Sequence, residues 1–160
     1  MTQKTKHKIK IYGISILISE LVGGLSALLT KGGMDLFATV NKPPLTPPSI
    51  AFPIVWSILF AIMGISAAIV YMAPPSKAKT YGIIIYVLQL SVNFFWSIFF
   101  FNLQAFGFSF FWLLLLIGLI VAMILEFYKV NKIAAYLQLP YLIWTAFAAY
   151  LTFNIWQLNK

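Results

Sequence analysis

Five long apolar runs, separated by short polar breaks, constrain this chain more than any other feature of its sequence. Each run has roughly 20 to 25 residues, and at a rise of about 1.5 Å per residue a helix of that length crosses a hydrocarbon core of about 30 Å. Stretches such as FFWLLLLIGLIVAMIL are apolar on every face, whereas the strands of a membrane barrel alternate apolar and polar residues. The runs cover about residues 9–30, 50–72, 81–101, 106–128 and 133–157.

This pattern predicts an all-α integral membrane protein, a single domain over residues 1–160 that forms a five-transmembrane-helix bundle. The composition supports this prediction, because 62% of the residues are hydrophobic and only 9% are charged. A soluble domain needs a polar surface that so few charges cannot supply. We therefore expect a multi-pass protein, with membrane lipid as its main partner, in a bacterial cell membrane.

The net charge of +8 does not indicate a nucleic-acid partner, because the lysines lie between apolar runs rather than on one folded face. Eight of them fall on the side of the N-terminus if the spans alternate, and the positive-inside rule then predicts a cytoplasmic N-terminus. The sequence has no Cys, and its one His, His7, lies in the polar N-terminal tail. A thiolate or histidine metal site is therefore not expected.

The one long connection, residues 31–49, contains four prolines and begins with a glycine pair. Because proline lacks a backbone donor and favours extended geometry, we expect a stiff loop that cannot become helical. Two interpretations remain open: a rigid linker, or a lid over a site that moves about Gly32 and Gly33. The prolines of this lid loop are Pro43, Pro44, Pro47 and Pro48.

Helical spacing places polar, small and aromatic residues of four spans on faces that could line one cavity. Such a cavity suits a planar, mostly apolar ligand that stacks on aromatic rings and is oriented by a few hydrogen bonds. The alternative is that the aromatic residues form belts at the membrane interfaces and that the small residues only allow close helix packing. The faces are Ser19, Gly23, Ser26 and Thr30; Phe52, Trp56 and Phe60; Gln89, Asn93, Trp96 and Phe100; and Trp144, Ala148, Leu151 and Ile155.

Other residues carry weaker signals. Glu20 is an acid inside the first span, so it is either a proton-coupling group of a transporter or a protonated structural residue. Gly64 with Ala68, and Gly118 with Ala122, have the spacing of helix-packing pairs. No nucleophile–base pair, paired carboxylates or phosphate loop is visible in the sequence, which disfavours hydrolytic or phosphoryl-transfer chemistry.

Several short motifs, in this order along the five spans, resemble the tryptophan-rich sensory protein and translocator protein family (TspO/MBR), also called peripheral benzodiazepine receptors. The resemblance covers almost the whole chain. The motifs are Lys42-Pro43, Pro47-Pro48, the run from Phe52 to Trp56 with Gly64 after it, the run from Asn93 to Trp96 with Phe99-Phe100 after it, and the run from Pro140 to Ala148.

The resemblance implies a bundle, often a homodimer, that binds porphyrins, sterols and benzodiazepine-like ligands under a lid loop for sensing or transport. No cofactor is required, although a porphyrin or haem-type molecule is an implied ligand. Some relatives degrade porphyrin, so an enzyme of that kind is the alternative from another class. Residues that match the family's pocket are Trp56, Phe60, Asn93, Trp96, Trp144 and Ala148, and we add Ser26 from the small-residue face.

The chain also departs from the family pattern. The loop reads Met34-Asp35-Leu36-Phe37 where relatives have a Trp-Tyr pair, so Phe37 is expected to replace one aromatic wall of the lid. Porphyrin degradation, which has been linked to loop tryptophans, loses support. In the last span Gln157 stands in place of the basic residue of the sterol motif, which weakens the prediction of sterol recognition.

Overall fold

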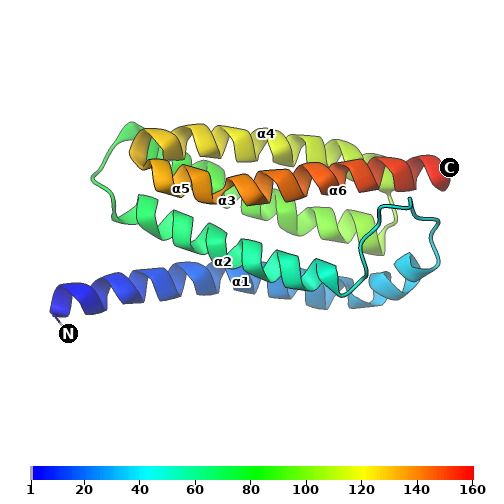
Figure 1. Ribbon diagram of the computed structural model, residues 1–160, viewed down its shortest axis with the longest axis horizontal. Helices are drawn as coiled ribbons and strands as arrows, with labels where there is room; N and C mark the ends of the chain where they lie inside the picture. The colour runs from blue at the N-terminus through cyan, green and yellow to red at the C-terminus, as the bar shows by residue number, and fades with distance from the viewer. Residues whose placement is uncertain (1) are drawn as a thin grey trace.

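The chain folds into a bundle of long helices, with no strand in residues 2–160, which are the residues that the computed structural model describes apart from the side chain of Leu36. Membrane spans that follow one another in the chain run antiparallel, and the two termini lie at opposite ends of the bundle (Figure 1). The elements are α1 (Gln3–Ala38), α2 (Ala51–Met72), α3 (Lys77–Ser97), the π-helical turn η1 (Ile98–Asn102), α4 (Phe106–Val130), α5 (Lys132–Leu137) and α6 (Leu139–Leu158).

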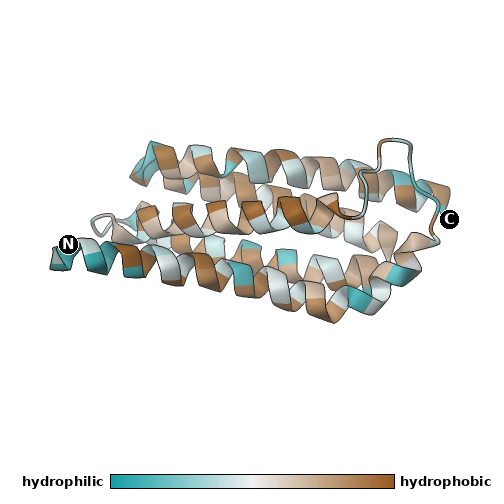
Figure 2. Cartoon of the chain, turned by 60° about the horizontal axis from the view of Figure 1, so that its bottom comes forward, coloured by the Kyte–Doolittle hydropathy of each residue, from teal (hydrophilic) through white to brown (hydrophobic). Residues whose placement is uncertain are grey.

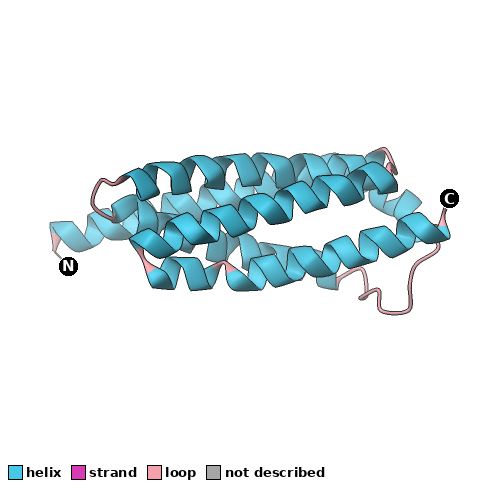
Figure 3. Cartoon of the chain, turned by 90° about the horizontal axis from the view of Figure 1, so that it is seen from above, coloured by secondary structure: helices cyan, strands magenta, loops and turns pink. Residues whose placement is uncertain are grey.

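Five helical segments within the described chain are long and apolar enough to cross a membrane. This confirms the prediction of an all-α integral membrane protein with five spans. The helices form a closed ring: α1 packs on α2, α2 on α5, α5 and α6 on α4, α4 on α3, and α3 with η1 on α1. Figure 3 shows the same bundle from above, with the long loop beside the C-terminus.

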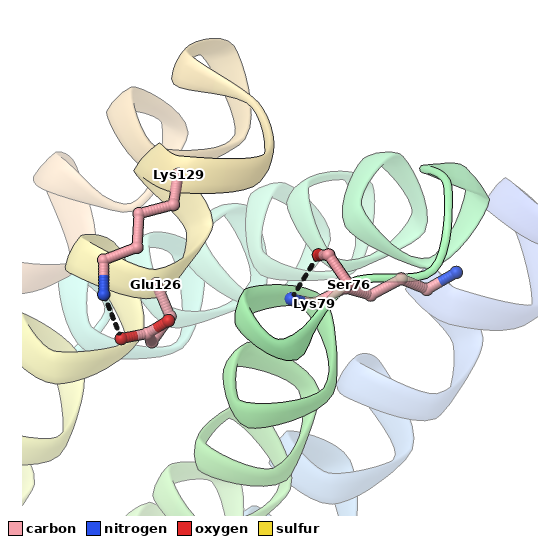
Figure 4. A network of polar contacts seen from close by, with 4 residues as sticks. All are labelled: Ser76, Lys79, Glu126 and Lys129. Carbon is pink, nitrogen blue, oxygen red and sulfur yellow. Dashed lines mark hydrogen bonds and ion pairs between the residues drawn. The ribbon is translucent and has the colours of Figure 1, made fainter.

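Polar caps and lysines mark the end of the bundle where the N-terminus lies. The N-terminal part of α1 is hydrophilic there (Figure 2). The Oγ of Ser76 accepts a hydrogen bond from the backbone N–H of Lys79 at the start of α3, at 3.1 Å. Lys129 forms an ion pair with Glu126 at the end of α4, at 2.6 Å; both contacts are drawn in Figure 4. The Ser76 cap satisfies a backbone group at a helix end close to the hydrocarbon.

The first helix is longer than predicted at both ends. It begins at Gln3 and continues to Ala38, so the prediction that residues 31–49 form one non-helical loop was wrong for residues 31–38. The helix can continue because the first proline comes only at Pro43. The helix end is capped by Lys42, whose Nζ donates to the backbone oxygen of Ala38 at 3.1 Å. The loop that remains runs from residue 39 to residue 50.

Gly33 is part of this helical extension and does not form a hinge in a loop. A Cβ at this position would lie 2.5 Å from the backbone oxygen of Phe101, so only glycine lets α1 approach η1 this closely. The amide of Asn102 adds a hydrogen bond to the backbone oxygen of Leu29 at 2.9 Å. Helix α1 is therefore fixed to η1 at the loop end of the bundle.

The third and fifth predicted spans are interrupted. The third ends in the π-turn η1, which adds one residue per turn and brings both Phe100 and Phe101 against Trp96. The fifth is divided at Gln138 into α5 and α6. Pro140 lies in the first turn of α6, where its missing N–H costs nothing but prevents a continuous helix.

Small residues set the distance between α1 and α2. A Cβ on Gly64 would lie 2.5 Å from the Cα of Ile16, so the two backbones touch at this point, as the small-residue spacing predicted. The Oγ of Ser15 also donates to the backbone oxygen of Gly64 at 2.8 Å. At Gly118, by contrast, a Cβ would meet nothing within 4 Å, so Gly118 makes no close helix contact within the chain.

We expect Gly64→Ala to destabilise the bundle by about 1–3 kcal/mol, because the added methyl group meets backbone atoms that cannot move aside. Gly118→Ala is the matched control; it adds the same atom in open space and is expected to be neutral or to stabilise by about 0.5–1 kcal/mol. Thermal unfolding in detergent, followed by circular dichroism, measures both. Equal unfolding temperatures for the two variants would contradict the packing assigned to Gly64.

Candidate functional site

A cavity with about 100 Å³ of free space lies between α1, α2 and α3, near the loop end. Helix α1 contributes its small-residue face, so the cavity is formed where large side chains are missing from one wall. Helices α2 and α3 contribute large aromatic side chains. The lining residues include Gly23, Ser26, Thr30 and Met34 of α1, Phe52, Trp56 and Phe60 of α2, Asn93 and Trp96 of α3, and Phe101 of η1.

Aromatic rings of α2 and α3 form one continuous wall of this cavity. The ring centroids of Trp56 and Trp96 are 6.3 Å apart, and those of Trp56 and Phe60 are 5.7 Å apart. Trp96 also stacks on Phe100 at 5.2 Å. These separations lie in the range of favourable aromatic pairs, and they leave broad apolar ring faces for a ligand.

A buried hydrogen-bond network fixes the polar corner of the cavity. The Nδ2 of Asn93 donates to the hydroxyl of Tyr141 at 2.9 Å, and that hydroxyl donates to the Oε1 of Gln89 at 2.7 Å. All three side chains are almost completely buried. Because Tyr141 belongs to α6 and the two amides to α3, the network links these helices and determines which way the amide of Asn93 faces.

Two other polar atoms that belong to cavity-lining residues are buried without a hydrogen-bond partner in the part of the chain that is described. They are the Oγ of Ser26 and the Nε1 of Trp96. A buried polar group without a partner costs about 1–3 kcal/mol. A ligand or a water molecule in the cavity would remove that cost, so these atoms are potential contacts for a bound molecule.

The structure brings five of the predicted site residues together around this one cavity: Ser26, Trp56, Phe60, Asn93 and Trp96. Two others, Phe37 and Ala148, line a separate space of about 20 Å³ on the other side of Trp96. Glu20 is partly exposed on α1 and is not among the residues of the cavity.

Trp144 was predicted in the pocket and is not among the residues that line it. It lies in an open groove between α2 and α6 and touches Phe52, a cavity residue, at 6.0 Å between ring centroids. The ring of Tyr141 packs against Trp56 instead, at 6.1 Å. The fully buried face of α6 passes through Tyr141, Thr145, Ala148, Thr152 and Ile155.

The spacing i, i+4, i+7, i+11 from Tyr141 identifies this face in the sequence. The prediction used the face that begins at Trp144 instead. It therefore missed the role of Tyr141. It also missed Phe101, which reaches the cavity only because the π-turn rotates the end of the third span, a feature that apolar periodicity does not reveal.

The loop of residues 39–50 lies beside the C-terminal end of α6 and is tied to it by Asn159. The side chain of Asn159 accepts from the backbone N–H of Asn41 at 3.1 Å and donates to the backbone oxygen of Asn41 at 2.9 Å. Within the loop, Thr46 closes a turn with Pro43 through a 3.1 Å backbone hydrogen bond. Nothing in the sequence pattern indicated the role of Asn159.

A second space of about 250 Å³ lies under this loop, next to Phe37, Lys42 and Pro47. Met34, Phe52 and Phe101 line both this space and the aromatic cavity. The three side chains therefore form the partition between the cavity and the underside of the loop. This arrangement is the one that the lid interpretation of the loop requires; a lid role remains a prediction.

Comparisons with known proteins identify relatives over most of the chain. The model of the TspO/MBR family matches residues 15–157. The tryptophan-rich protein TspO of Chlorobaculum tepidum is 40% identical over 135 residues, 84% of this chain and 85% of that protein. The translocator protein of Bos taurus is 33% identical over 147 residues, with 90% and 87% covered. The uncharacterized membrane protein YtaB of Bacillus subtilis is 39% identical over 158 residues, with 89% and 99% covered.

We expect Tyr141→Phe to lower the free energy of unfolding by about 1–3 kcal/mol, because both amides that contact its hydroxyl lose a buried partner. Tyr150→Phe, on the exposed face of the same helix, is the control and should change stability by less than about 0.5 kcal/mol. Chemical unfolding in detergent measures the difference. The network would not have the importance assigned to it if the two variants were equally stable.

Asn159→Ala is expected to release the loop. Hydrogen exchange of the amides in residues 40–50 should become faster by about fivefold or more, because two hydrogen bonds to Asn41 are lost. The control is Asn154→Ala, since the amide of Asn154 donates to Tyr150 of its own helix. Unchanged protection of the loop in Asn159→Ala would show that other contacts hold it.

Proposed function

This chain belongs to the TspO/MBR family, and on that premise we propose that it is a membrane receptor or carrier for a porphyrin or a similar flat hydrophobic molecule. The proposed binding site is the aromatic cavity between α1, α2 and α3. Sensing and transport would both begin with this binding step. The name of the bovine relative, translocator protein, agrees with a carrier.

One observation carries the proposal: two indole rings and a phenyl ring form a continuous wall beside a small set of fixed polar atoms. A planar apolar ligand would stack on Trp56 and Trp96. With its nitrogen committed to Tyr141, Asn93 would use its Oδ1 to accept a hydrogen bond from the ligand. Trp96 and Ser26 supply donors for an acceptor on the ligand.

The size of the cavity determines how such a ligand must enter. Its 100 Å³ is well below the 300 Å³ or more that is usual for small-molecule sites. The proposal therefore includes an opening step in which Phe52, Met34 and Phe101 move and join the cavity to the space under the loop. Rearrangement of residues 39–50 would accompany this step, as lid loops do in other ligand-binding proteins.

Protoporphyrin binding to the purified protein in detergent tests the proposal. We expect Trp56→Ala to raise the Kd by about tenfold, since loss of a stacking indole costs about 0.5–1.5 kcal/mol beyond its buried area. Trp156→Ala is the control, because Trp156 packs on Phe110, Phe153 and Gly107 at the interface of α4 and α6. The shift of the porphyrin absorption band reports binding in all variants.

Trp144→Ala is expected to weaken binding less than Trp56→Ala does, because Trp144 does not line the cavity and contacts its lining residue Phe52 instead. Unchanged affinity in a Trp56→Ala, Asn93→Leu double variant would refute the site. Light-dependent loss of the porphyrin spectrum with a new product, in the pure protein, would instead support the alternative of a porphyrin-degrading enzyme.

A further inference from the structure

A second apolar depression lies outside the aromatic cavity, near the N-terminal end of α1. It has about 410 Å³ of free space between α1, α2 and α3. Its sides are mainly aliphatic, with two tyrosines, and several of the lining residues, including Ile14 and Val87, are about half exposed. We refer to it as the α1–α3 groove, and its main lining residues are Ile11, Ile14, Ile18, Tyr71, Ile83 and Val87.

The groove exists because α1 and α3 are held together at the loop end and midway along the bundle, but not toward the N-terminus. At the loop end, Asn102 and Gly33 bring η1 into direct contact with α1. Midway, Ser19 and Tyr86 share a buried hydrogen bond of 2.5 Å. Beyond that bond, toward the N-terminus, the two helices leave the groove between them, so the bond separates it from the aromatic cavity.

Cationic side chains lie where the groove meets the end of the bundle. Lys79 lies one helical turn before Ile83, and its Nζ donates to the backbone oxygens of Tyr71 and Ala73 at 2.6 and 2.8 Å. Figure 4 shows its side chain directed away from the Glu126–Lys129 pair, so that pair does not neutralise it. The position of Lys79 is therefore fixed at the rim by the C-terminus of α2.

Helix α1 adds further positive charge at the same rim. Lys4 and Lys8 continue, at i−7 and i−3 from Ile11, the face of α1 that lines the groove. This part of α1 extends past the ends of the other helices (Figure 1) and is hydrophilic (Figure 2). The chain has three acids: Glu126 is paired with Lys129, Asp35 lies at the opposite end of α1, and Glu20 of α1 is not among the residues that line the groove.

We propose that the α1–α3 groove binds one acyl chain of an anionic phospholipid in the leaflet on the N-terminal side, with Lys8 and Lys79 holding the phosphate. From Ile11 to Ile18 the groove extends about 10 Å along α1, at about 1.5 Å per residue. That length matches the part of an acyl chain next to the headgroup in a leaflet about 15 Å deep. This inference does not depend on the ligand of the aromatic cavity.

Two observations favour a lipid over a second copy of the chain. The lysine-rich rims of two copies would face each other, and like charges repel, whereas a phosphate complements them. Helix α1 is also the least buried of the five spans. A bound acyl chain would cover this helix where its own neighbours leave it exposed.

Native mass spectrometry of the full chain, in detergent with equal amounts of phosphatidylglycerol and phosphatidylcholine of the same acyl chains, tests the proposal. We expect preferential retention of phosphatidylglycerol. Val87→Trp fills the groove and should remove most of the retained lipid. Its control is Leu115→Trp, which places the same side chain on an exposed position of α4 outside the groove.

The role of the lysines is tested by charge removal. Lys79→Gln and Lys8→Gln should each lower the preference for phosphatidylglycerol by about fivefold, the value of one lysine near an anionic headgroup. Lys132→Gln is the matched control, because it removes the same charge at the same end, where Lys132 lies over the ring of Tyr128. An equal effect of Lys132→Gln would overturn the proposal in favour of general surface attraction.

Two other outcomes would also overturn it. Lipid retention that is the same in Val87→Trp and Leu115→Trp would show that the groove is not the site. A change in the ratio of monomer to dimer in Val87→Trp, with lipid retention unaltered, would assign the groove to a second copy of the chain. Thermal unfolding of all variants in detergent verifies that they fold. Val87 and Leu115 are exposed, so we expect a tryptophan at either position to be tolerated.

Discussion

The hydrocarbon around this protein offers no hydrogen bonds, and every feature of the bundle depends on that constraint. Backbone groups must be satisfied within the chain, so the apolar runs have no alternative to the helix. The two irregular places obey the same rule. At η1 the backbone keeps hydrogen bonds of a wider turn, with the N–H of Leu103 donating to the oxygen of Ile98. At Gln138 the break is placed where Pro140 has no N–H to lose.

Packing between the helices has to come from fit and from polar contacts, because burial against lipid gives no hydrophobic gain. Gly64 and Gly33 provide the fit. Gly64 lets α2 approach the backbone of α1, and Gly33 lets η1 approach α1. The hydroxyl of Tyr141 provides the polar contact between α6 and the two amides of α3. The aromatic cavity lies where these two kinds of contact meet, with α1 supplying small residues and α3 supplying the fixed amide.

The spans could be predicted from the sequence because their signal, apolar residues on every face over 20 or more positions, is independent of tertiary structure. The ends of the spans could not be predicted in this way. The extension of α1 to Ala38 depends on the close approach of Gly33 to Phe101, a contact between residues far apart in sequence. Most residues that line the aromatic cavity from α1, α2 and α3 belong to the predicted faces, because each face is regular, but Ser19, Gln89 and Phe100 of those faces do not line it. Trp144 was misplaced because its helix starts anew after Gln138 and turns Tyr141 inward.

The buried contacts of α1 also decide from which side a ligand can reach the aromatic cavity. Ser15 donates to Gly64 of α2, Ser19 donates to the backbone oxygen of Ser15, and Ser19 shares a hydrogen bond with Tyr86 of α3. This chain of hydrogen bonds joins three helices between the cavity and the α1–α3 groove. Opening that side would leave several buried polar groups without partners at once.

On the loop side, the cavity is closed by three apolar side chains, Met34, Phe52 and Phe101. These side chains can rotate without losing a hydrogen bond. A ligand from the bilayer would therefore pass under residues 39–50, while a lipid in the groove would remain outside the cavity.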